Sequence, residues 1–201
     1  MTDGTLVIAA QRVDSGDSAD LSEITELARA AGYEVVATLA QSRTEDAAYH
    51  FGEGKVEALA GLVAETGAAA VVVDNRLGPY QTYNIGGTLP TGVEVIDRFT
   101  LILEIFGQRA NTRKAQLQVE LAELRYELPR AEAKASLAKR GERPGFMGLG
   151  EHDESRERDI KAQTSRVEQE LDDIADTEET RREPRRASGL GLVARAGYTH
   201  G

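Results

Sequence analysis

The chain has 201 residues, of which 40% are hydrophobic and only 5% aromatic, so one domain or two small ones must pack an aliphatic core. The formal net charge of -10 argues against general nucleic-acid affinity over the whole surface, and the absence of cysteine excludes a disulfide framework and fits a reducing compartment. The apolar run at residues 6–10 has no basic segment before it and is too short for a signal peptide or a membrane span, so no membrane association is expected.

Apolar runs alternate with segments of helical periodicity over the first hundred residues. Four short apolar runs predict buried strands, at residues 5–10, 33–40, 69–73 and 93–96. Between them the pattern predicts helices at residues 21–31, 56–66 and 80–86. One short extended piece is predicted at residues 47–51. Strands that alternate with helices indicate βαβ units, so the predicted fold is α/β, with a parallel sheet flanked by helices. The order of the strands stays open.

From Phe99 onward the periodicity becomes purely helical. Residues 99–106 suit a helix packed on the sheet, a bend is expected at 107–111, and Thr112 can cap the next helix. That helix carries a heptad seam that needs a partner helix: Leu117, Leu121, Leu124, Leu128, Ala131, Ala135 and Ala138. A second long segment repeats the spacing: Ile160, Thr164, Val167, Leu171 and Ile174. The sequence therefore predicts a long antiparallel two-helix coiled-coil arm after the sheet.

Proline and glycine are expected to limit the helices of this arm. Pro129 lies inside the first helix and predicts a kink there. A glycine-rich tip at residues 141–150 should interrupt the helix, after which Asp153 can cap the second helix and Pro184 can end it. The expected organisation is an α/β subdomain at 1–98, the helical arm at 99–183, and at 184–201 a linker with one more strand, at 190–196.

A glycine turn precedes the helix predicted at residues 56–66. Gly52, Gly54 and Lys55 lie in the sequence Gly-Glu-Gly-Lys. Backbone amides at a helix N-terminus, together with a lysine, could hold a phosphate. The same residues could instead form a tight turn that feeds a helix with an exposed lysine. A small nucleotide-binding α/β domain is therefore kept as an alternative function.

Polar residues also follow the predicted strands, namely Asp74, Asn75, Asp97 and Arg98. Ligands of open α/β sheets bind near the carboxyl ends of strands, but helix caps and Asp–Arg pairs are common at the same places. The three histidines, His50, His152 and His200, show no spacing typical of metal ligands. No Ser/His/Asp set is evident. Neither a metal site nor hydrolytic chemistry is predicted.

Residues 107–146 hold 9 basic and 5 acidic residues, a net positive segment in an acidic chain. These cations could bind RNA, and the glycine-rich tip has few side chains to obstruct an RNA backbone. They could also form a solvated helix face with ion pairs between neighbouring turns. The candidates for contact with RNA or the ribosome are Arg109, Arg113, Lys114, Lys134, Lys139, Arg140 and Arg143.

Several segments together resemble the HflX family of ribosome-associated GTPases. FGEGKVEAL at residues 51–59 and DNRLGPYQTYNI at 74–85 match two motifs of that family, and residues 95–130 follow its longest diagnostic block nearly throughout. PGFMGLGE at residues 144–151 is similar to the archaeal form of its glycine-rich loop. Gly197, Tyr198 and Thr199 match the start of its phosphate loop, G-Y-T-N-A-G-K-S, in which His200 replaces the usual Asn.

The resemblance implies an α/β subdomain and a two-helix arm that precede a GTPase domain. It implies that the amino-terminal part docks on the large ribosomal subunit and its RNA, with the tip near the peptidyl-transferase region, and that the GTP-bound protein helps to separate stalled ribosomes. GTP and Mg²⁺ are the cofactors implied for full-length members, which are expected to be cytoplasmic and monomeric.

The sequence stops before the second glycine, the lysine and the Ser/Thr of the phosphate loop. Neither a cofactor nor GTP hydrolysis is expected of this chain alone, which is interpreted as a fragment or a truncated gene product. A coiled-coil interaction protein is kept as a further alternative.

Overall fold

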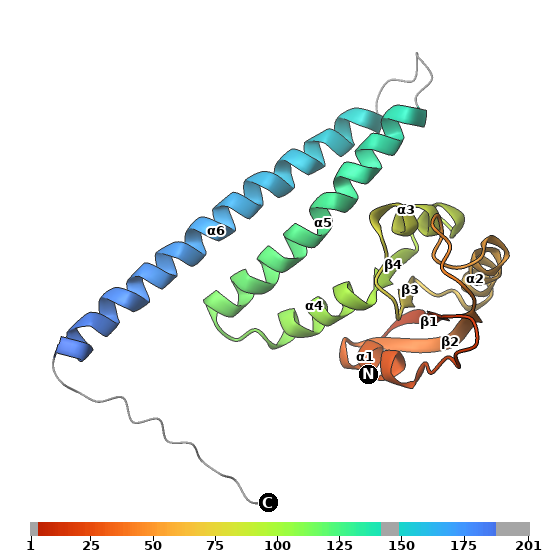
Figure 1. Cartoon of the computed structure of the whole chain (residues 1–201), viewed down its shortest axis with the longest axis horizontal. Coiled ribbons are helices and arrows are strands. Elements are labelled where there is room, and N and C mark those ends of the chain that lie inside the picture. The colour runs from red at the N-terminus through yellow and green to blue at the C-terminus, as the bar shows by residue number, and fades with distance from the viewer. Residues whose placement is uncertain (1–3, 142–148, 188–201) are drawn as a thin grey trace, which may run out of the picture.

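The computed structural model describes residues 4–141 and 149–187, with side chains described over 4–136 and 155–177 and at Thr180. A four-stranded sheet with helices on both faces precedes two long helices (Figure 1). The strands are β1 Thr5–Val13, β2 Tyr33–Ser42, β3 Ala70–Val73 and β4 Glu94–Asp97. They pair in parallel in the order β2-β1-β3-β4, which confirms the predicted parallel sheet and supplies the strand order.

Six helices complete the described structure: α1 Ser22–Ala30, α2 Glu53–Thr66, α3 Pro79–Thr88, α4 Arg98–Arg109, α5 Arg113–Gly141 and α6 Leu149–Ala187. Helices α2 and α3 cover one face of the sheet, where Ile8, Val71 and Val73 join their core. Helices α1 and α4 cover the other face, where Val7 and Val72 are buried. The central strands β1 and β3 are thus buried on both faces, which is why they read as continuous apolar runs.

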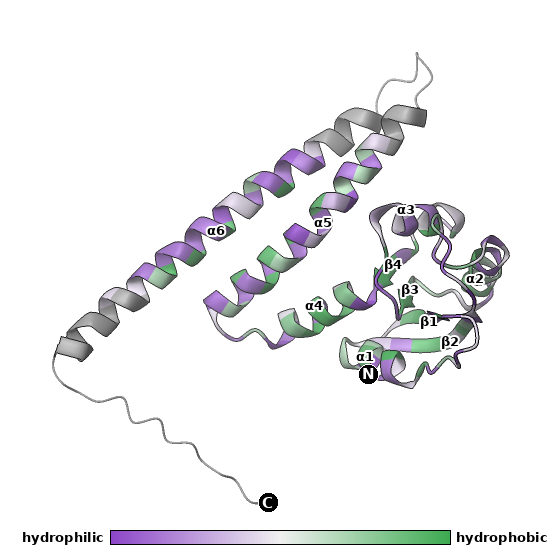
Figure 2. Ribbon diagram, in the orientation of Figure 1, coloured by the Kyte–Doolittle hydropathy of each residue, from purple (hydrophilic) through white to green (hydrophobic). Residues whose placement is uncertain are grey.

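We call the sheet with α1–α4 the head, and α5 with α6 the arm. The two arm helices lie side by side and run antiparallel (Figure 1), and apolar residues recur along both of them (Figure 2). The seam of α5 is buried against α6 through Leu117, Leu124, Ala131, Ile160 and Val167, with Leu121, Leu128, Leu171 and Ile174 packed at its edges. At the start of α5, Thr112 Oγ1 accepts a hydrogen bond from the Ala115 amide at 3.1 Å, as predicted for a helix cap.

Several predicted boundaries were wrong. Residues 47–51 form a turn, closed by an isolated bridge between Asp46 and His50, because two backbone hydrogen bonds between those residues reverse the chain. Helix α2 begins at Glu53, since Gly52 can act as its N-cap without a side chain. The predicted cap Asp153 lies inside α6, which starts four residues earlier at Leu149.

Pro184 does not end α6, which continues to Ala187, and α5 likewise runs through Pro129. A proline removes one backbone hydrogen bond, and a long helix with many others can continue past it. The predicted strand at 190–196 and most of the predicted tip, residues 142–148, lie outside the described residues. Within the described ranges, none of the helices is both long and apolar enough to cross a membrane.

Candidate functional site

Helix α5 uses two faces. One is the seam against α6, and the other packs on the head, where α5 contacts α3 and α4. Tyr126 and Arg130 project from this second face and are one turn apart, so both can reach the same point of the head. That point is the carboxyl end of β4.

Asp97, the last residue of β4, joins the head to the arm. Its carboxylate is 1% exposed and caps α4, where Oδ1 accepts from the amide and the hydroxyl of Thr100 at 2.9 Å each. Oδ2 accepts from the Leu77 amide at 3.1 Å, from Arg130 Nη2 at 3.0 Å and from the Tyr126 hydroxyl. The carboxylate therefore fixes the β3–α3 loop, α4 and α5 to one another.

Asp97 is negatively charged at neutral pH. Burial alone would raise its pKa, but the hydrogen bond from Tyr126, the amides of Thr100 and Leu77 and the charge of Arg130 outweigh burial and hold the pKa below its ordinary value. The same contact raises the pKa of Tyr126, first through burial of the phenol and then through its hydrogen bond to Asp97. A buried carboxylate with this many donors is typical of a structural anchor.

An aromatic and cationic stack surrounds this carboxylate. The rings of Phe99 and Tyr126 lie 4.3 Å apart between centroids. The Arg130 guanidinium lies over the Tyr126 ring at 4.0 Å, and that of Arg76 lies 5.3 Å from the same ring. A cation–π contact of this kind can hold a guanidinium beside an aromatic ring even where no carboxylate is paired with it. We call these four residues and Asp97 the head–arm junction.

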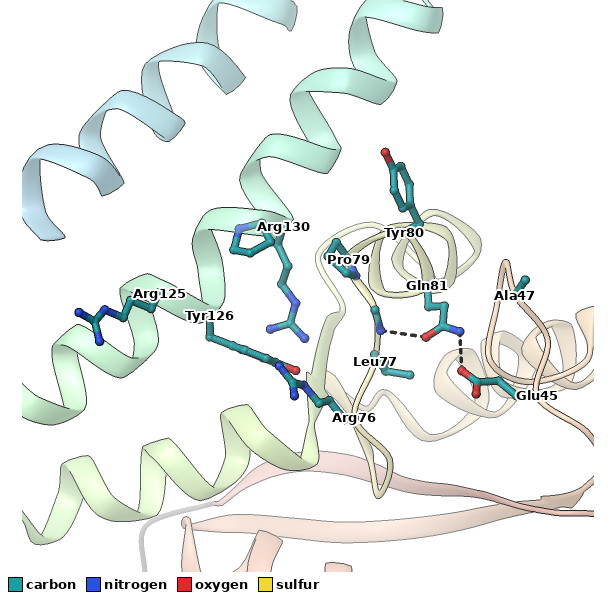
Figure 3. A pocket seen from close by; sticks show the side chains of 12 residues that line it. Glu45, Ala47, Arg76, Leu77, Pro79, Tyr80, Gln81, Arg125, Tyr126 and Arg130 are labelled. Atoms are coloured by element: carbon teal, nitrogen blue, oxygen red, sulfur yellow. Dashed lines mark hydrogen bonds between the residues drawn. The ribbon is translucent and has the colours of Figure 1, made fainter.

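Beside the junction lies a cavity of about 580 Å³, between the N-terminus of α3 and the second face of α5 (Figure 3). Its walls come from the head and the arm together: Glu45, Ala47, Arg76, Leu77, Gly78, Pro79, Tyr80, Gln81, Arg125, Tyr126, Pro129 and Arg130. The size is that of a small-molecule site, and the lining combines three arginines with flat apolar side chains. Three arginines, Arg76, Arg125 and Arg130, give this cavity a cationic lining.

Hydrogen bonds fix the rim of the cavity on the head side. Gln81 Oε1 accepts from the Gly78 amide at 2.8 Å, and Gln81 Nε2 donates to Glu45 at 2.8 Å. Glu45 also contacts Nδ1 of the buried His50 at 3.1 Å, while His50 Nε2 accepts from Arg12. Hydrogen bonds from Gln81 and then from His50 hold the pKa of Glu45 below its ordinary value. The rim is thus built from β1, the turn at 46–50 and α3.

The other polar residues at strand ends are structural. Arg98 pairs with Asp74 and with Glu23 of α1. Asn75 accepts from the Arg12 amide at 2.8 Å and donates to the Arg12 carbonyl at 3.0 Å. These contacts tie neighbouring strands and helices together. Among the described residues no group of acidic, histidine or cysteine side chains is arranged to hold a metal ion.

The predicted phosphate turn lies apart from this cavity, at the N-terminus of α2. The Gly52 amide donates to Gln41 Oε1 at 2.8 Å, and the amide of Lys55 donates to the Gly52 carbonyl. A Cβ at Gly52 would lie 1.9 Å from Arg43 Nη1, so the flexible end of the Arg43 side chain would have to move, whereas a Cβ at Gly54 would meet nothing within 4 Å. The turn is therefore well packed, and phosphate binding by Gly52, Gly54 and Lys55 stays a prediction.

The candidate ribosome contacts fall into two groups. Arg109, Arg113 and Lys114 lie at the corner between α4 and α5, and Arg113 forms a bidentate pair with Glu170 at 2.6 and 2.7 Å. Lys134 and the helical residues Lys139 and Arg140 lie toward the other end of α5. Twenty residues of helix separate Lys114 from Lys134, which is ~30 Å. Arg143 lies outside the described residues, as do Gly197, Tyr198 and Thr199, and the side chains of Lys139 and Arg140 are not described.

Reasoning from sequence missed the residues that build the junction and the cavity: Arg76, Tyr80, Phe99 and Tyr126. The available signal was weak. Val119, Ala122 and Tyr126 repeat at helical spacing on the face of α5 opposite the leucine seam. A second apolar stripe on a helix indicates a second partner, but the stripe is short and contains polar neighbours.

Comparison with known proteins places the whole chain. Two family models match, one described as GTP-binding GTPase N-terminal over residues 18–107 and one as GTP-binding GTPase Middle Region over 109–185. Their boundary coincides with the end of α4, at the corner between head and arm. Both models describe parts of GTP-binding GTPases.

Curated relatives and solved structures that match the chain are also GTP-binding proteins. The chain is 41% identical to GTPase HflX of Thermococcus kodakarensis over 180 residues, which cover 89% of this chain and 40% of the relative. It is 44% identical to GTPase HflX of Thermofilum pendens over 196 residues, or 96% of this chain and 46% of that protein. A crystal structure of a GTP-binding protein from Sulfolobus solfataricus in complex with GDP matches with a TM-score of 0.59 at 22% identity, and covers 84% of this chain and 45% of that one. A crystal structure of SsGBP in complex with GDP matches with a TM-score of 0.65 at 24% identity, and the match covers 86% of this chain and 45% of that one.

The solved structures share the fold, and the curated relatives are similar over nearly the whole chain. The chain spans less than half the length of these relatives. It belongs to the HflX family of GTP-binding proteins and corresponds to their amino-terminal and middle regions.

Proposed function

We propose that this chain is the ribosome-binding module of an HflX-type GTP-binding protein, and that it docks on the large ribosomal subunit and its RNA. Together with a GTPase domain that uses GTP and Mg²⁺, the module takes part in splitting or rescuing stalled ribosomes. It acts in the cytoplasm as a monomer. Membership of the HflX family supports this proposal, because the curated relatives named above are GTPases.

We further infer that α5 and α6 form a two-helix coiled coil. The support is the heptad seam, whose members Leu117 and Leu124 of α5 are buried together with Ile160 and Val167 of α6. Because the seam is already covered within the chain, it is not available to a partner helix. This disfavours the alternative of a coiled-coil protein that seeks a partner through its leucines.

The observation that carries the proposal is an arm that is held at its middle and projects beyond the head (Figure 1). Helix α5 has 29 residues and is therefore ~44 Å long, and the junction holds it at Tyr126 and Arg130. Ion pairs join the two arm helices, such as Arg125 with Glu168 at 2.8 Å and Lys161 with Glu132 at 3.3 Å. An arm of this length can reach into a cleft of a large partner.

Charge determines which end of the arm binds RNA. Residues 1–100 hold 15 acidic and 6 basic side chains, so phosphate is repelled by most of the head, whereas residues 107–146 have a surplus of basic side chains. At the α4–α5 corner, Arg113 is already paired with Glu170. We assign the principal contact to the far end of α5, because Lys134, Lys139 and Arg140 follow one another along the helix there.

Co-sedimentation of the purified chain with large ribosomal subunits tests this function. The double substitution Lys139→Gln/Arg140→Gln is expected to reduce binding and to flatten its salt dependence, since each lost phosphate contact removes roughly 0.7–0.9 from the slope. The matched control is Arg29→Gln/Arg43→Gln, which removes the same charge from exposed positions of the head. Loss of binding in the control with retention in the arm variant would contradict the proposal.

A further inference from the structure

The cavity beside the head–arm junction has an imbalance of charge. Of its three arginines, Arg130 is paired with Asp97 at 3.0 Å and Arg125 with Glu168 at 2.8 Å. Arg76 is exposed, and none of the described carboxylates lies within ion-pair distance of it. It lies beside the rings of Phe99 and Tyr126, at 5.7 and 5.3 Å from their centroids. One guanidinium is therefore preorganised at the cavity without an anion.

No described carboxylate pairs with Arg76. Glu45 on the rim carries a negative charge, but its Oε1 accepts from Gln81 at 2.8 Å and lies 3.1 Å from His50 Nδ1, so its contacts are with the head and not with Arg76. The N-terminus of the ten-residue helix α3 also borders the cavity. The Gly78 amide is bonded to Gln81 and Pro79 has no N–H, so this helix end contributes only the partial positive charge of its dipole, which favours an anion. The site is therefore suited to a single negative charge.

The remaining walls are flat and apolar. Pro79 and Tyr80 come from α3 (Figure 3), and Pro129 comes from α5. Tyr80 is 46% exposed, so a large part of its side chain is open to solvent. Tyr126 is already covered by Arg76 and Arg130, so Tyr80 is the cavity-lining ring that is open to a ligand. An exposed ring beside an unpaired arginine is the arrangement by which proteins hold one nucleotide of a single strand.

We propose that this cavity binds one unpaired nucleotide of an RNA chain, with the base stacked on Tyr80 between the two prolines and the phosphodiester at Arg76. A phosphodiester carries one negative charge, which matches the single unpaired guanidinium. A free nucleoside diphosphate or triphosphate carries several, and the cavity offers no second unpaired cation among the described residues. An acidic peptide would use Arg76 but would leave the aromatic wall without a partner. The proposal rests on the proposed function in one respect, because it takes the RNA to be ribosomal.

Fluorescence anisotropy with a labelled hexaadenylate tests the site on the 201-residue chain. Tyr80→Ala is expected to weaken binding about fivefold or more, the lower end of what a stacked base contributes. Tyr83→Ala is the matched control, because Tyr83 is 44% exposed on the same helix but does not line the cavity. Arg76→Gln is expected to weaken binding and to lower the salt slope by roughly 0.7, and Arg29→Gln to do neither. Circular dichroism spectra confirm that each variant is folded.

Three outcomes would overturn the site. Binding that is equal in Tyr80→Ala and Tyr83→Ala places the RNA elsewhere, and so does an unchanged salt slope in Arg76→Gln. Displacement of hexaadenylate by adenosine monophosphate at equal affinity identifies a free-nucleotide pocket instead. Failure here is distinguishable from failure of the proposed function, because Lys139→Gln/Arg140→Gln is measured on ribosomal subunits and does not touch the cavity.

Discussion

The substitution Asp97→Asn tests whether the buried carboxylate anchors the arm to the head. Asparagine has nearly the same shape but replaces one oxygen by an amide donor. Oδ1 can still accept from the amide and hydroxyl of Thr100. At the place of Oδ2, however, an NH₂ group would face the Leu77 amide and the Arg130 guanidinium, which are also donors.

The expected loss follows from these contacts. A buried backbone donor without a partner costs about 1–3 kcal/mol, and a hydrogen bond to a charged group contributes about 1.5–3 kcal/mol. The side chain of Arg130 is 20% exposed, so water can replace part of its lost interaction. We therefore expect Asp97→Asn to lower the free energy of unfolding by about 3 kcal/mol, a large part of the ~5–15 kcal/mol of a typical domain. Tyr126→Phe removes one donor and leaves the acceptor satisfied, so it should cost only about 1 kcal/mol.

Urea unfolding followed by circular dichroism measures both variants. Asp17→Asn is the matched control, since it removes the same charge from an exposed loop and should change stability by less than ~0.5 kcal/mol. If Asp97→Asn is as stable as Asp17→Asn, the carboxylate is not an anchor and the reasoning about the junction is wrong. A loss in Tyr126→Phe larger than in Asp97→Asn would also refute it, because the hydroxyl is only one of the donors.

Three further predictions concern pH, the seam and helix α2. Because the folded pKa of Asp97 is lowered, its contribution to stability is fully present above the ordinary carboxyl pKa of 3.8 and is lost as pH falls through the folded value; acid titration of unfolding should show this loss in the wild type and not in Asp97→Asn. Leu117→Ala, at a fully buried position, should cost about 2–5 kcal/mol in urea unfolding, and Gln118→Ala on the same helix almost nothing, so equal losses would contradict the packing of the seam. Gly61→Ala, in the middle of α2 with open space around it, should raise the melting temperature. Gly67→Ala should lower the melting temperature, because alanine at φ +68 is strained by about 1–2 kcal/mol. A shift of the same sign in both variants would contradict the left-handed conformation of the cap at Gly67.

The central strands and the seam could be predicted from sequence because burial there follows a simple period. Val71 and Val72 belong to a strand covered on both faces, and such strands read as uninterrupted apolar runs. The leucine seam of α5 repeats at heptad spacing, which only a packed helix requires. Helix ends were harder, because Gly52 caps α2 through its backbone conformation and not through a side chain whose type could be recognised.

The junction could not be predicted because its contacts join residues far apart in the chain. Asp97 and Arg98 are adjacent and suggest a local pair, yet Arg98 pairs with Asp74 and Asp97 with Arg130, 33 residues later. In the sequence, Arg130 looks like any other cation of a basic helix. Only the packing of α5 on the head brings Arg130 to this carboxylate.

The junction also makes the arm a lever with its pivot at Arg130. Eleven residues of α5 extend from Arg130 to Gly141, which is ~16 Å, so a tilt of ~10° about the pivot would displace the end of α5 by ~3 Å. Such a displacement equals the length of a hydrogen bond and is enough to make or break a contact with a partner. A small rearrangement of Arg130 and Tyr126 in the head–arm junction would thus produce a larger displacement at the end of α5, where neither residue is present.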